Sequence, residues 1–499
     1  MTPTPTLPRS HRAGALSALL IAAAAACSPA TAQSTHECRV AGIRNSVRCG
    51  EVQRLLDPAR PDGPRIAVQF VVVPAMARRK LPDPVFLLAG GPGQSAIAVA
   101  PNLLPMFSRL NNRRDIVFVD QRGTGKSASL ECADPQRESL ADQSGPDRQI
   151  KLLMECKAAL AKLPYIGAES NLGFFTTTLA MHDLDAVRQQ LGAERINLVG
   201  ASYGTRAALE YMRLFPQAVR RTVIDGVAPP DMVLPASFST DGQAALDALL
   251  DACAREVECK RLYPALRTDW AALLQSLPKS VTAAHPLTGM PEQFTLTRQM
   301  LLSAVRGPLY VPSMAAGLPA AVTAAAHGRF EALLGLGAML ASRKGQQVAM
   351  GMHFSVVCAE DMPLIDRAVD TPGADFGTAD AQLYRRVCAQ WPRGAVPAAF
   401  YRVPPSRTPT LLLSGGIDPA TPPRHAARTA LALGPAAQHV VVPHAGHGVM
   451  GIGCMRDVVY RFIDAAQDID ATAVDASCIK SVPRPPVFVP TQLVAKDAQ

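Results

Sequence analysis

The sequence has 499 residues, of which 48% are hydrophobic and 18% charged, a balance that excludes an intrinsically disordered chain and allows a large buried core. The net charge of +9 is modest for this length and is not gathered into a run of Lys and Arg, and aromatic residues make up only 5%. Because a nucleic-acid groove combines clustered cations with stacking aromatic rings, we expect no nucleic-acid partner.

The N-terminal segment has the layout of an export signal. A basic stretch precedes the apolar residues 13–26, and Ala30-Thr31-Ala32 offers small side chains at the two positions that a signal peptidase reads. We therefore predict a signal peptide over residues 1–32, with cleavage after Ala32 and export of the protein to the periplasm or the medium.

Two further features bear on the membrane. A lipoprotein anchored through Cys27 is the minor alternative to this cleavage, although Ala24 stands where lipoprotein signals usually carry Leu. No later segment has the roughly 20 consecutive apolar residues that a spanning helix needs. We expect an exported protein without a transmembrane segment.

Ten cysteines follow the predicted signal, an even number that suits disulfides in an oxidising compartment. Their spacing contains no CxxC, which argues against zinc, and we expect no metal. Many pairings are possible, and we favour the sequential one because each bridge then closes a short local loop. The expected pairs are Cys38 with Cys49, Cys132 with Cys156, Cys253 with Cys259, Cys358 with Cys388, and Cys454 with Cys478.

After a hairpin-like segment between Cys38 and Cys49, short apolar runs alternate with helical patterns. The runs typical of strands buried on both faces are 66–73, 85–88, 116–119, 196–199, 222–224, 410–413 and 439–442. Between these runs, residues 179–191 and 203–215 have the periodicity of helices. This alternation predicts an α/β fold with a mostly parallel sheet and helices on both faces.

The interval between the strands at 222–224 and 410–413 has little strand pattern and much helix-like sequence, for example at 243–258 and 318–326. We interpret it as an inserted helical cap. The predicted organisation is a signal peptide at 1–32, the first part of the core at 33–228, the cap at 229–407, the second part of the core with the acid and histidine loops at 408–480, and an extended Pro-rich surface tail at 481–499.

Residues 119–128, VDQRGTGKSA, raise the question of nucleotide binding, because Gly125-Lys126-Ser127 ends like a phosphate-binding loop after an apolar run. In that motif a glycine occupies the position that Asp120 holds here, and a long helix should follow where Cys132 and Pro135 stand. We therefore reject a phosphate site at this stretch.

The motif Gly200-Ala201-Ser202-Tyr203-Gly204 lies between a predicted strand and a predicted helix, which is the context that G-x-S-x-G requires. A nucleophile in such a sharp turn needs small neighbours, and the helix N-terminus favours developing negative charge. We predict Ser202 as a catalytic nucleophile.

Two later loops offer the acid and the base that a serine nucleophile requires. Asp418 follows the predicted strand at 410–413, and His447 follows the one at 439–442, in the order acid then histidine that this class of motif uses. We predict Asp418 and His447 as the triad partners, with an ordinary turn aspartate as the alternative reading of Asp418.

His444 and His425 are the alternatives for the base. Gly446 and Gly448 favour His447, because small neighbours let a loop hold an imidazole close to the nucleophile. We expect a structural part for His444 beside Pro443, and a helical position for His425.

The oxyanion formed on attack needs two fixed N–H donors. One is the amide of Tyr203, directly after the nucleophile. The other should come from the glycine-rich loop Gly90-Gly91-Pro92-Gly93 after the predicted strand at 85–88, and we favour the amide of Gly91.

Jointly, these motifs resemble the prolyl aminopeptidase and tripeptidyl aminopeptidase family of α/β-hydrolases, over about residues 66–478. The motifs that carry the resemblance are Gly90-Gly91-Pro92-Gly93, Asp120-Gln121-Arg122-Gly123, Gly200-x-Ser202-Tyr203-Gly204, Asp418 and Gly446-His447-Gly448. The resemblance implies an α/β-hydrolase core, a helical cap over the site, a Ser-Asp-His triad, no cofactor, and peptide substrates with a free N-terminus.

By the same resemblance, Asp120 and Arg122 belong to a stretch that braces the oxyanion loop, with Arg122 as its hydrogen-bonding brace. Ala89 stands where the prolyl enzymes usually carry His. This departure favours the exported tripeptidyl-type branch and leaves a preference for proline open.

A free α-amino group is cationic, so carboxylates in the cap are its natural ligands. Glu360 and Asp361 form an adjacent acid pair beside Cys358 in an otherwise apolar stretch, and we predict them as ligands of the substrate amine. The alternative is a solvated acid pair at a helix end.

The sequence therefore favours an exported serine hydrolase of the aminopeptidase type. A carboxylesterase or lipase-like hydrolase with the same triad is the alternative function. A non-enzymatic binding protein is disfavoured, because every catalytic part is present in the expected order.

Overall fold

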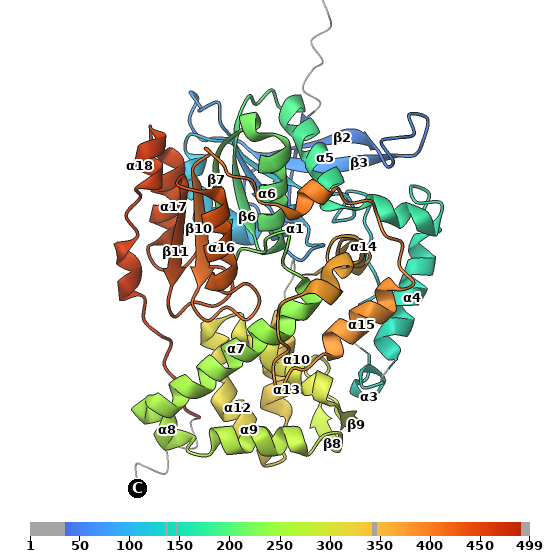
Figure 1. Ribbon diagram of the computed structural model, residues 1–499, viewed down its shortest axis with the longest axis vertical. Coiled ribbons are helices and arrows are strands. Elements are labelled where there is room, and N and C mark those ends of the chain that lie inside the picture. Colours follow the sequence, from blue (N-terminus) through green and yellow to red (C-terminus); the bar gives the residue numbers. More distant parts are fainter. Residues whose placement is uncertain (1–34, 135–137, 146, 342–346, 491–499) are drawn as a thin grey trace, which may run out of the picture. The chain divides into compact units, whose positions relative to one another are not determined.

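A nine-stranded sheet forms the centre of the described chain, which comprises residues 35–134, 138–145, 147–341 and 347–490 of a computed structural model (Figure 1). Across the sheet the order is β1 (Thr35–Cys38), β2 (Val47–Leu55), β3 (Arg65–Val73), β5 (Ile116–Val119), β4 (Val85–Leu88), β6 (Ile196–Ala201), β7 (Val219–Asp225), β10 (Thr410–Gly415) and β11 (Ala437–Val442). The pairs from β1 to β5 are antiparallel, and all later pairs are parallel. The predicted mostly parallel sheet is confirmed.

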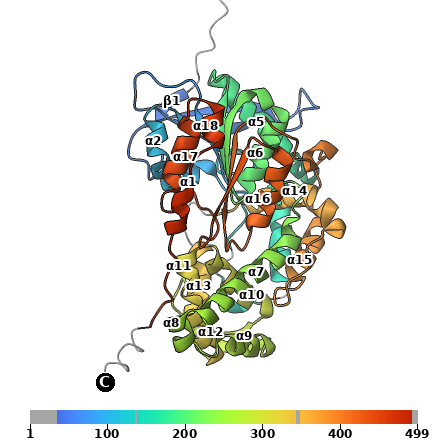
Figure 2. The same ribbon diagram turned by 60° about the vertical axis from the view of Figure 1, so that its left-hand side comes forward.

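Helices cover both faces of this sheet, because its central strands are apolar on both sides. In β4, Phe86 and Leu88 join the hydrophobic core under α5 and α6, whereas Val85 and Leu87 join the core under α1 and α17. Figure 2 shows these two helix groups on opposite sides of the strands. The helices outside the β7–β10 connection are α1 (Ala96–Leu103), α2 (Ser108–Asn111), α3 (Leu140–Gln143), α4 (Arg148–Leu160), α5 (Thr177–Gln190), α6 (Tyr203–Leu214), α16 (Pro423–Leu433), α17 (Met455–Asp464) and α18 (Asp468–Thr472).

Residues 226–409, here called the insertion, connect β7 to its neighbour β10. Both views place its first helices, α7 to α13, together below the sheet (Figures 1 and 2). The helices are α7 (Leu234–Arg255), α8 (Val257–Leu262), α9 (Leu266–Gln275), α10 (Arg298–Leu309), α11 (Pro312–Ala315), α12 (Leu318–Ala326), α13 (Glu331–Ala341), α14 (Met350–Glu360) and α15 (Ala379–Cys388).

The insertion also contains a β-hairpin that the sequence pattern did not predict. β8 (Lys279–Ala284) pairs antiparallel with β9 (Pro291–Leu296). Val281, Phe294 and Leu296 point into the core of the insertion, while alternate residues are exposed. Alternation of apolar and polar residues marks a half-buried strand, but here it covers only residues 281–283 and 294–296, too few to stand out among the helical patterns.

All five predicted disulfides are present: Cys38–Cys49, Cys132–Cys156, Cys253–Cys259, Cys358–Cys388 and Cys454–Cys478. Sequential pairing therefore describes every bridge.

The described part of the Pro-rich tail has no helix or strand after Ser481, and it contacts the insertion. The Phe488 amide donates to the Ala316 carbonyl (3.0 Å), and the Tyr263 hydroxyl donates to the Phe488 carbonyl (2.7 Å). The predicted signal peptide, with Cys27, and residues 491–499 lie outside the described residues.

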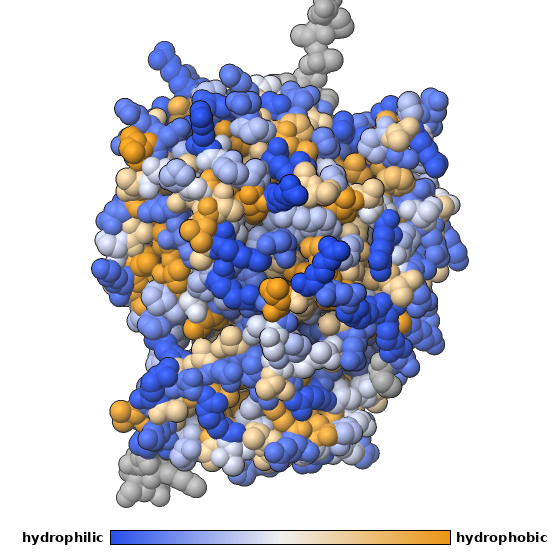
Figure 3. All heavy atoms as spheres, viewed as in Figure 1, coloured by the Kyte–Doolittle hydropathy of each residue, from blue (hydrophilic) through white to orange (hydrophobic). Residues whose placement is uncertain are grey.

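The surface drawn in Figure 3 has hydrophobic residues scattered among hydrophilic ones. Within the described ranges, no helix is long and apolar enough to cross a membrane.

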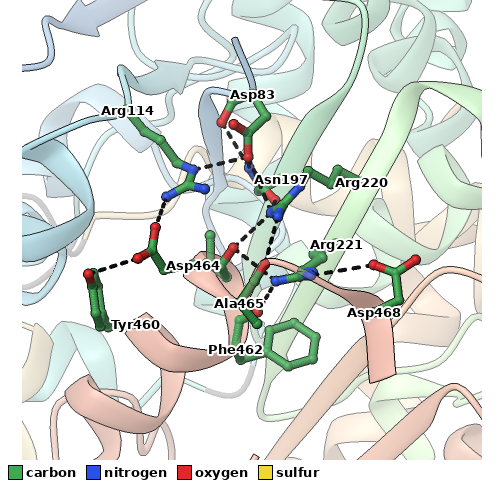
Figure 4. Close-up of polar contacts among 11 residues, drawn as sticks. Asp83, Arg114, Asn197, Arg220, Arg221, Tyr460, Phe462, Asp464, Ala465 and Asp468 are labelled. Atoms are coloured by element: carbon green, nitrogen blue, oxygen red, sulfur yellow. Dashed lines mark hydrogen bonds and ion pairs between the residues drawn. The ribbon is translucent and has the colours of Figure 1, made fainter. Parts of the chain in front are cut away.

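Arginines anchor the C-terminal end of α17 to the sheet (Figure 4). Arg220 and Arg221, in β7, donate to backbone carbonyls within residues 462–467, and Arg114 pairs with Asp464 at 2.5 Å. Because α17 follows the predicted histidine loop in the chain, this network fixes the course of the chain beyond that loop.

Candidate active site

Ser202 lies in a strained turn between β6 and α6. Its φ is 56° and its ψ −125°, a conformation that residues other than glycine rarely adopt. A Cβ on Gly200 would lie 2.4 Å from the Gly204 carbonyl oxygen, and a Cβ on Gly204 would lie 2.2 Å from that of Leu88. Gly200 is therefore needed for β6 and α6 to meet this closely, and Gly204 for α6 to approach the end of β4.

The predicted acid and base contact each other. His447 Nδ1 donates to Asp418 Oδ2 at 2.8 Å, and the side chain of Asp418 is fully buried while that of His447 is 16% exposed. Asp418 Oδ1 accepts hydrogen bonds from the amides of Ala420 (2.8 Å) and Thr421 (2.9 Å), which fix the carboxylate. With the proton on Nδ1, Nε2 of His447 has the lone pair that a general base uses.

Neighbouring parallel strands bring the three predicted residues to one edge of the sheet. Ser202 follows β6, Asp418 follows β10 and His447 follows β11, while β7 lies between β6 and β10. The carboxyl ends of parallel strands share an edge, and α/β sheets place their active sites there.

Asp225, the last residue of β7, was not predicted from the sequence. Its backbone carbonyl accepts from the amide of Ser202 (2.9 Å), and its Oδ2 accepts from the amides of Val449 (2.7 Å) and Met450 (2.8 Å). One buried residue thus joins the nucleophile turn to the histidine loop. The available signal was the same as for Asp418, an aspartate at the end of an apolar strand.

Neighbouring carboxylates set the pKa of His447. Burial favours the neutral ring, but the charge of Asp418, its hydrogen bond and the charge of Asp225 outweigh burial and raise the pKa of His447. For Asp418, burial is likewise outweighed, mainly by the charge and hydrogen bond of His447, and the pKa is lowered. For Asp225, burial outweighs its two amide bonds and raises the pKa to about 6.

The glycine-rich loop before α1 lies against the nucleophile turn. A Cβ on Gly90 would lie 3.0 Å from Ser202 Cβ. Gly91 has a φ of 109°, and a Cβ there would lie 2.6 Å from the Gly93 nitrogen, so the loop needs glycine at this point. The other predicted donor, the Tyr203 amide, is the first N–H of α6, which has no acceptor within its own helix.

Asp120 and Arg122, the two predicted braces, act at different places. Asp120 Oδ1 accepts from Ser95 Oγ (2.7 Å) and from the Ile97 amide (3.0 Å), so it holds the chain where the glycine-rich loop enters α1. Arg122 instead pairs with Asp183 of α5 through two nitrogens, at 2.7 and 2.9 Å.

Arg122 also donates to the carbonyls of Leu55, Leu56 and Phe174. The prediction that Arg122 is the hydrogen-bonding brace of the oxyanion loop is therefore wrong, because its guanidinium joins α5 to the end of β2. The DQRG stretch can be recognised in the sequence, but the partner of the Arg122 side chain cannot.

Glu360 and Asp361 are not available to a substrate amine. Arg206 donates to both oxygens of Asp361, at 3.0 and 3.1 Å, while Glu360 accepts from the amide (2.7 Å) and hydroxyl (2.9 Å) of Thr177. Both acids are 1% exposed, and burial raises the pKa of Glu360 to about 7 against the opposing charge of Arg206. The predicted amine site is therefore wrong, since Arg206 already supplies the cation. The solvated alternative is wrong too, because the pair is buried.

The two alternative histidines have different surroundings. His425 is buried in α16, and its Nε2 lies 2.9 Å from Asp241 Oδ2. His444 is exposed in the turn after β11. Of the three histidines, His447 is the one paired with the predicted acid.

Two family models match the chain. Residues 83–253 match the model described as alpha/beta hydrolase fold, and residues 374–478 match the one described as TAP-like protein. With the sheet order and the turn at Ser202, these matches define the class: the protein is an enzyme of the α/β-hydrolase fold. Within that class its motifs resemble those of the tripeptidyl and prolyl aminopeptidases, and proteins with these names match parts of the chain.

Three curated relatives carry the names of peptidases. The chain is 27% identical over 411 residues to the serine protease Hip1 of Mycobacterium tuberculosis, covering 76% of this chain and 78% of that protein. It is 31% identical over 192 residues to a tripeptidyl aminopeptidase of Streptomyces lividans (37% of this chain, 36% of that protein). It is also 30% identical over 145 residues to a probable proline iminopeptidase of Streptomyces coelicolor (29% and 33%).

Proposed function

We propose that this protein is an exported serine aminopeptidase that releases N-terminal residues or short peptides through an acyl-enzyme. The observation that carries the proposal is the buried Asp418–His447 pair at the same sheet edge as the strained Ser202 turn. The similarity to proteins named as peptidases supports a peptide substrate.

In the proposed reaction, Ser202 Oγ attacks the scissile carbonyl carbon and transfers its proton to His447 Nε2. Asp418 holds the Nδ1–H tautomer and stabilises the imidazolium. The amides of Gly91 and Tyr203 donate to the oxyanion, a type of contact worth roughly 10²–10³ in rate for each donor.

Collapse of this intermediate breaks the C–N bond as His447 returns the proton to the leaving amine. Water, deprotonated by the same imidazole, then attacks the acyl carbon. The bond from this carbon to Ser202 Oγ breaks, His447 returns the proton to Ser202, and the peptide acid leaves. Each step uses a residue at the edge formed by β6, β10 and β11.

Export is part of the proposal. The ten cysteines of the described chain form five disulfides, and such bridges persist in oxidising compartments. Isolation of the protein from cell fractions, with sequencing of its N-terminus, tests cleavage after Ala32 against attachment through Cys27.

The test of the activity uses two chromogenic peptides that differ only in a free or acetylated N-terminus. Ser202→Ala should lower kcat by up to about 10⁶-fold, the scale of a triad knockout. Ser280→Ala, at an exposed serine in β8, is the matched control and should behave as wild type.

Cleavage of the free peptide alone supports an aminopeptidase. Cleavage of both peptides indicates an endopeptidase, and hydrolysis of a short acyl ester with neither peptide cleaved indicates a carboxylesterase. A rate for Ser202→Ala within about tenfold of wild type contradicts the assignment of the nucleophile.

A further inference from the structure

The segment that opens α14 packs directly on the glycine-rich loop. The Ala349 amide donates to the Gly93 carbonyl (2.9 Å), and Val348 forms an isolated antiparallel bridge with Gln94. A Cβ on Gly93 would lie 2.8 Å from the Ala349 carbonyl oxygen, so this contact leaves no space for a side chain. The loop predicted to hold the oxyanion is thus clamped by the insertion, from a point about 250 residues away in the chain.

His353, one turn into α14, bonds to the same loop. Its Nδ1 lies 3.2 Å from the Pro92 carbonyl oxygen, and its Nε2 lies 2.7 Å from the Tyr384 hydroxyl in α15. A carbonyl oxygen only accepts, so Nδ1 carries the proton. In a neutral ring Nε2 is then an acceptor, and Tyr384 donates to it.

The surroundings keep this ring neutral. His353 is 7% exposed, and burial lowers its pKa to about 4, although the Pro92 carbonyl and the charge of Asp361 oppose the shift. The rings of Phe354 and Tyr384 pack edge-on against it, 5.4 and 5.7 Å between ring centroids. The imidazole therefore has one tautomer and one orientation.

We propose that His353 is a positioning residue that holds the Gly91–Pro92–Gly93 segment in the geometry needed for oxyanion stabilisation, with Tyr384 fixing its tautomer. The inference rests on the proposed function. His353 does not touch the reacting atoms; it fixes the Pro92 carbonyl, which one intervening peptide unit separates from the Gly91 amide. Ala89, which precedes the loop, has no side chain able to take this role, and His353 supplies it from the insertion.

Two substitutions distinguish the roles of the two ring nitrogens of His353. In His353→Asn the side-chain amide nitrogen takes the place of Nδ1 and still donates to the Pro92 carbonyl. In His353→Gln the longer amide reaches the position of Nε2 near Tyr384 and loses the bond to Pro92. His327→Gln, at an exposed histidine that ends α12, is the matched control.

His353→Gln should lower kcat about 10- to 100-fold with a smaller change in KM, because the loop acts on the transition state more than on the bound substrate. His353→Asn should keep kcat within about threefold of wild type, which is a smaller change than the loss of an oxyanion donor causes. Steady-state kinetics on the peptide that wild type cleaves, with thermal melting of each variant, provide the readout.

Equal losses of kcat in the Asn and Gln variants, or no loss in either, would overturn the inference. If the Gln variant melts below the assay temperature, Tyr384→Phe replaces it, because this change removes only the hydroxyl that donates to His353. The kcat of Tyr384→Phe should fall severalfold, and an unchanged kcat overturns the role of Tyr384. Failure of the proposed function gives a different result, since wild type would then cleave no peptide in a Ser202-dependent way.

Discussion

Asp225 couples the proposed nucleophile, Ser202, to the proposed base, His447, through both its backbone and its side chain. Its carbonyl orients the Ser202 amide, while its carboxylate holds two amides just beyond His447. Oδ1 of this carboxylate is buried without a hydrogen bond among the described residues. A buried carboxylate left half-paired is unfavourable for folding, while its charge favours the protonated imidazole of His447.

Asp225→Asn should move the acid limb of the kcat/KM profile to lower pH. The charges of Asp418 and Asp225 raise the pKa of His447 against burial, and the pKa of Asp225 itself is about 6. Its negative charge stabilises the imidazolium, and the neutral amide would let His447 lose its proton at lower pH. The shift is measured from initial rates at subsaturating substrate concentrations, over roughly pH 5 to 9, which includes the range in which histidine titrates.

The control for this prediction is Asp457→Asn, which removes one negative charge at an exposed position of α17. Its acid limb should coincide with that of wild type. An acid limb that stays in place in Asp225→Asn, or moves to higher pH, would contradict the coupling.

At this scale the sequence predicted what local motifs encode. Ser202 lies within a G-x-S-x-G motif, His447 lies between two glycines and Asp418 follows an apolar strand, and these patterns can be read from the sequence alone. Glu360 and Asp361 were misjudged because their partner, Arg206, comes from a helix about 150 residues earlier. His353 carries no local pattern, since its role depends on a carbonyl in another loop.

Among the elements, α17 shows how a helix end is fixed to the sheet. The guanidinium of Arg221 donates to the carbonyls of Phe462 (2.5 Å), Ile463 (3.1 Å) and Gln467 (3.0 Å), and its side chain is fully buried. The last carbonyls of a helix have no partner within the helix, so this arginine satisfies groups that burial would otherwise leave unpaired.

Arg221→Leu should therefore destabilise the protein by about 1–3 kcal/mol, because it leaves the buried Phe462 carbonyl without its donor, while Ile463 keeps a bond from Arg220. Asp468→Asn is the matched control: this acid is 70% exposed and 3.4 Å from Arg221, and its loss should change stability by less than about 0.5 kcal/mol. Denaturant-induced unfolding followed by circular dichroism measures both. Similar values for the two variants would show that the carbonyl contacts contribute little.

Elements with continuous apolar runs were the ones predicted well. β4 and β5 occupy the residues expected for them, because strands buried on both faces have no polar positions to obscure the pattern. The β8–β9 hairpin was missed because its alternating pattern covers only residues 281–283 and 294–296, which is too short to be recognised.

For the molecule as a whole, disulfides staple the insertion as well as the core. Cys358–Cys388 joins α14 to α15, the two helices that carry His353 and Tyr384, and it closes a separation of 30 residues. Cys253–Cys259 joins α7 to α8 over only 6 residues. Cys358–Cys388 therefore closes the longer loop and joins the helices of His353 and Tyr384. Cys253–Cys259 closes the shorter loop and joins two other helices of the insertion.

Replacing Cys358 and Cys388 together by Ser should lower the free energy of unfolding by about 4 kcal/mol, and the same change at Cys253 and Cys259 by about 2 kcal/mol, because the longer loop gains more entropy when it is opened. The first variant should also lose kcat, since the bridge holds His353 against its tyrosine, while the second should keep it. Unfolding curves and steady-state kinetics on both variants test this pairing of effects. The two variants are compared under conditions where the same fraction of each is folded. If their kcat values then fall equally, the Cys358–Cys388 bridge stabilises the fold without positioning the glycine-rich loop.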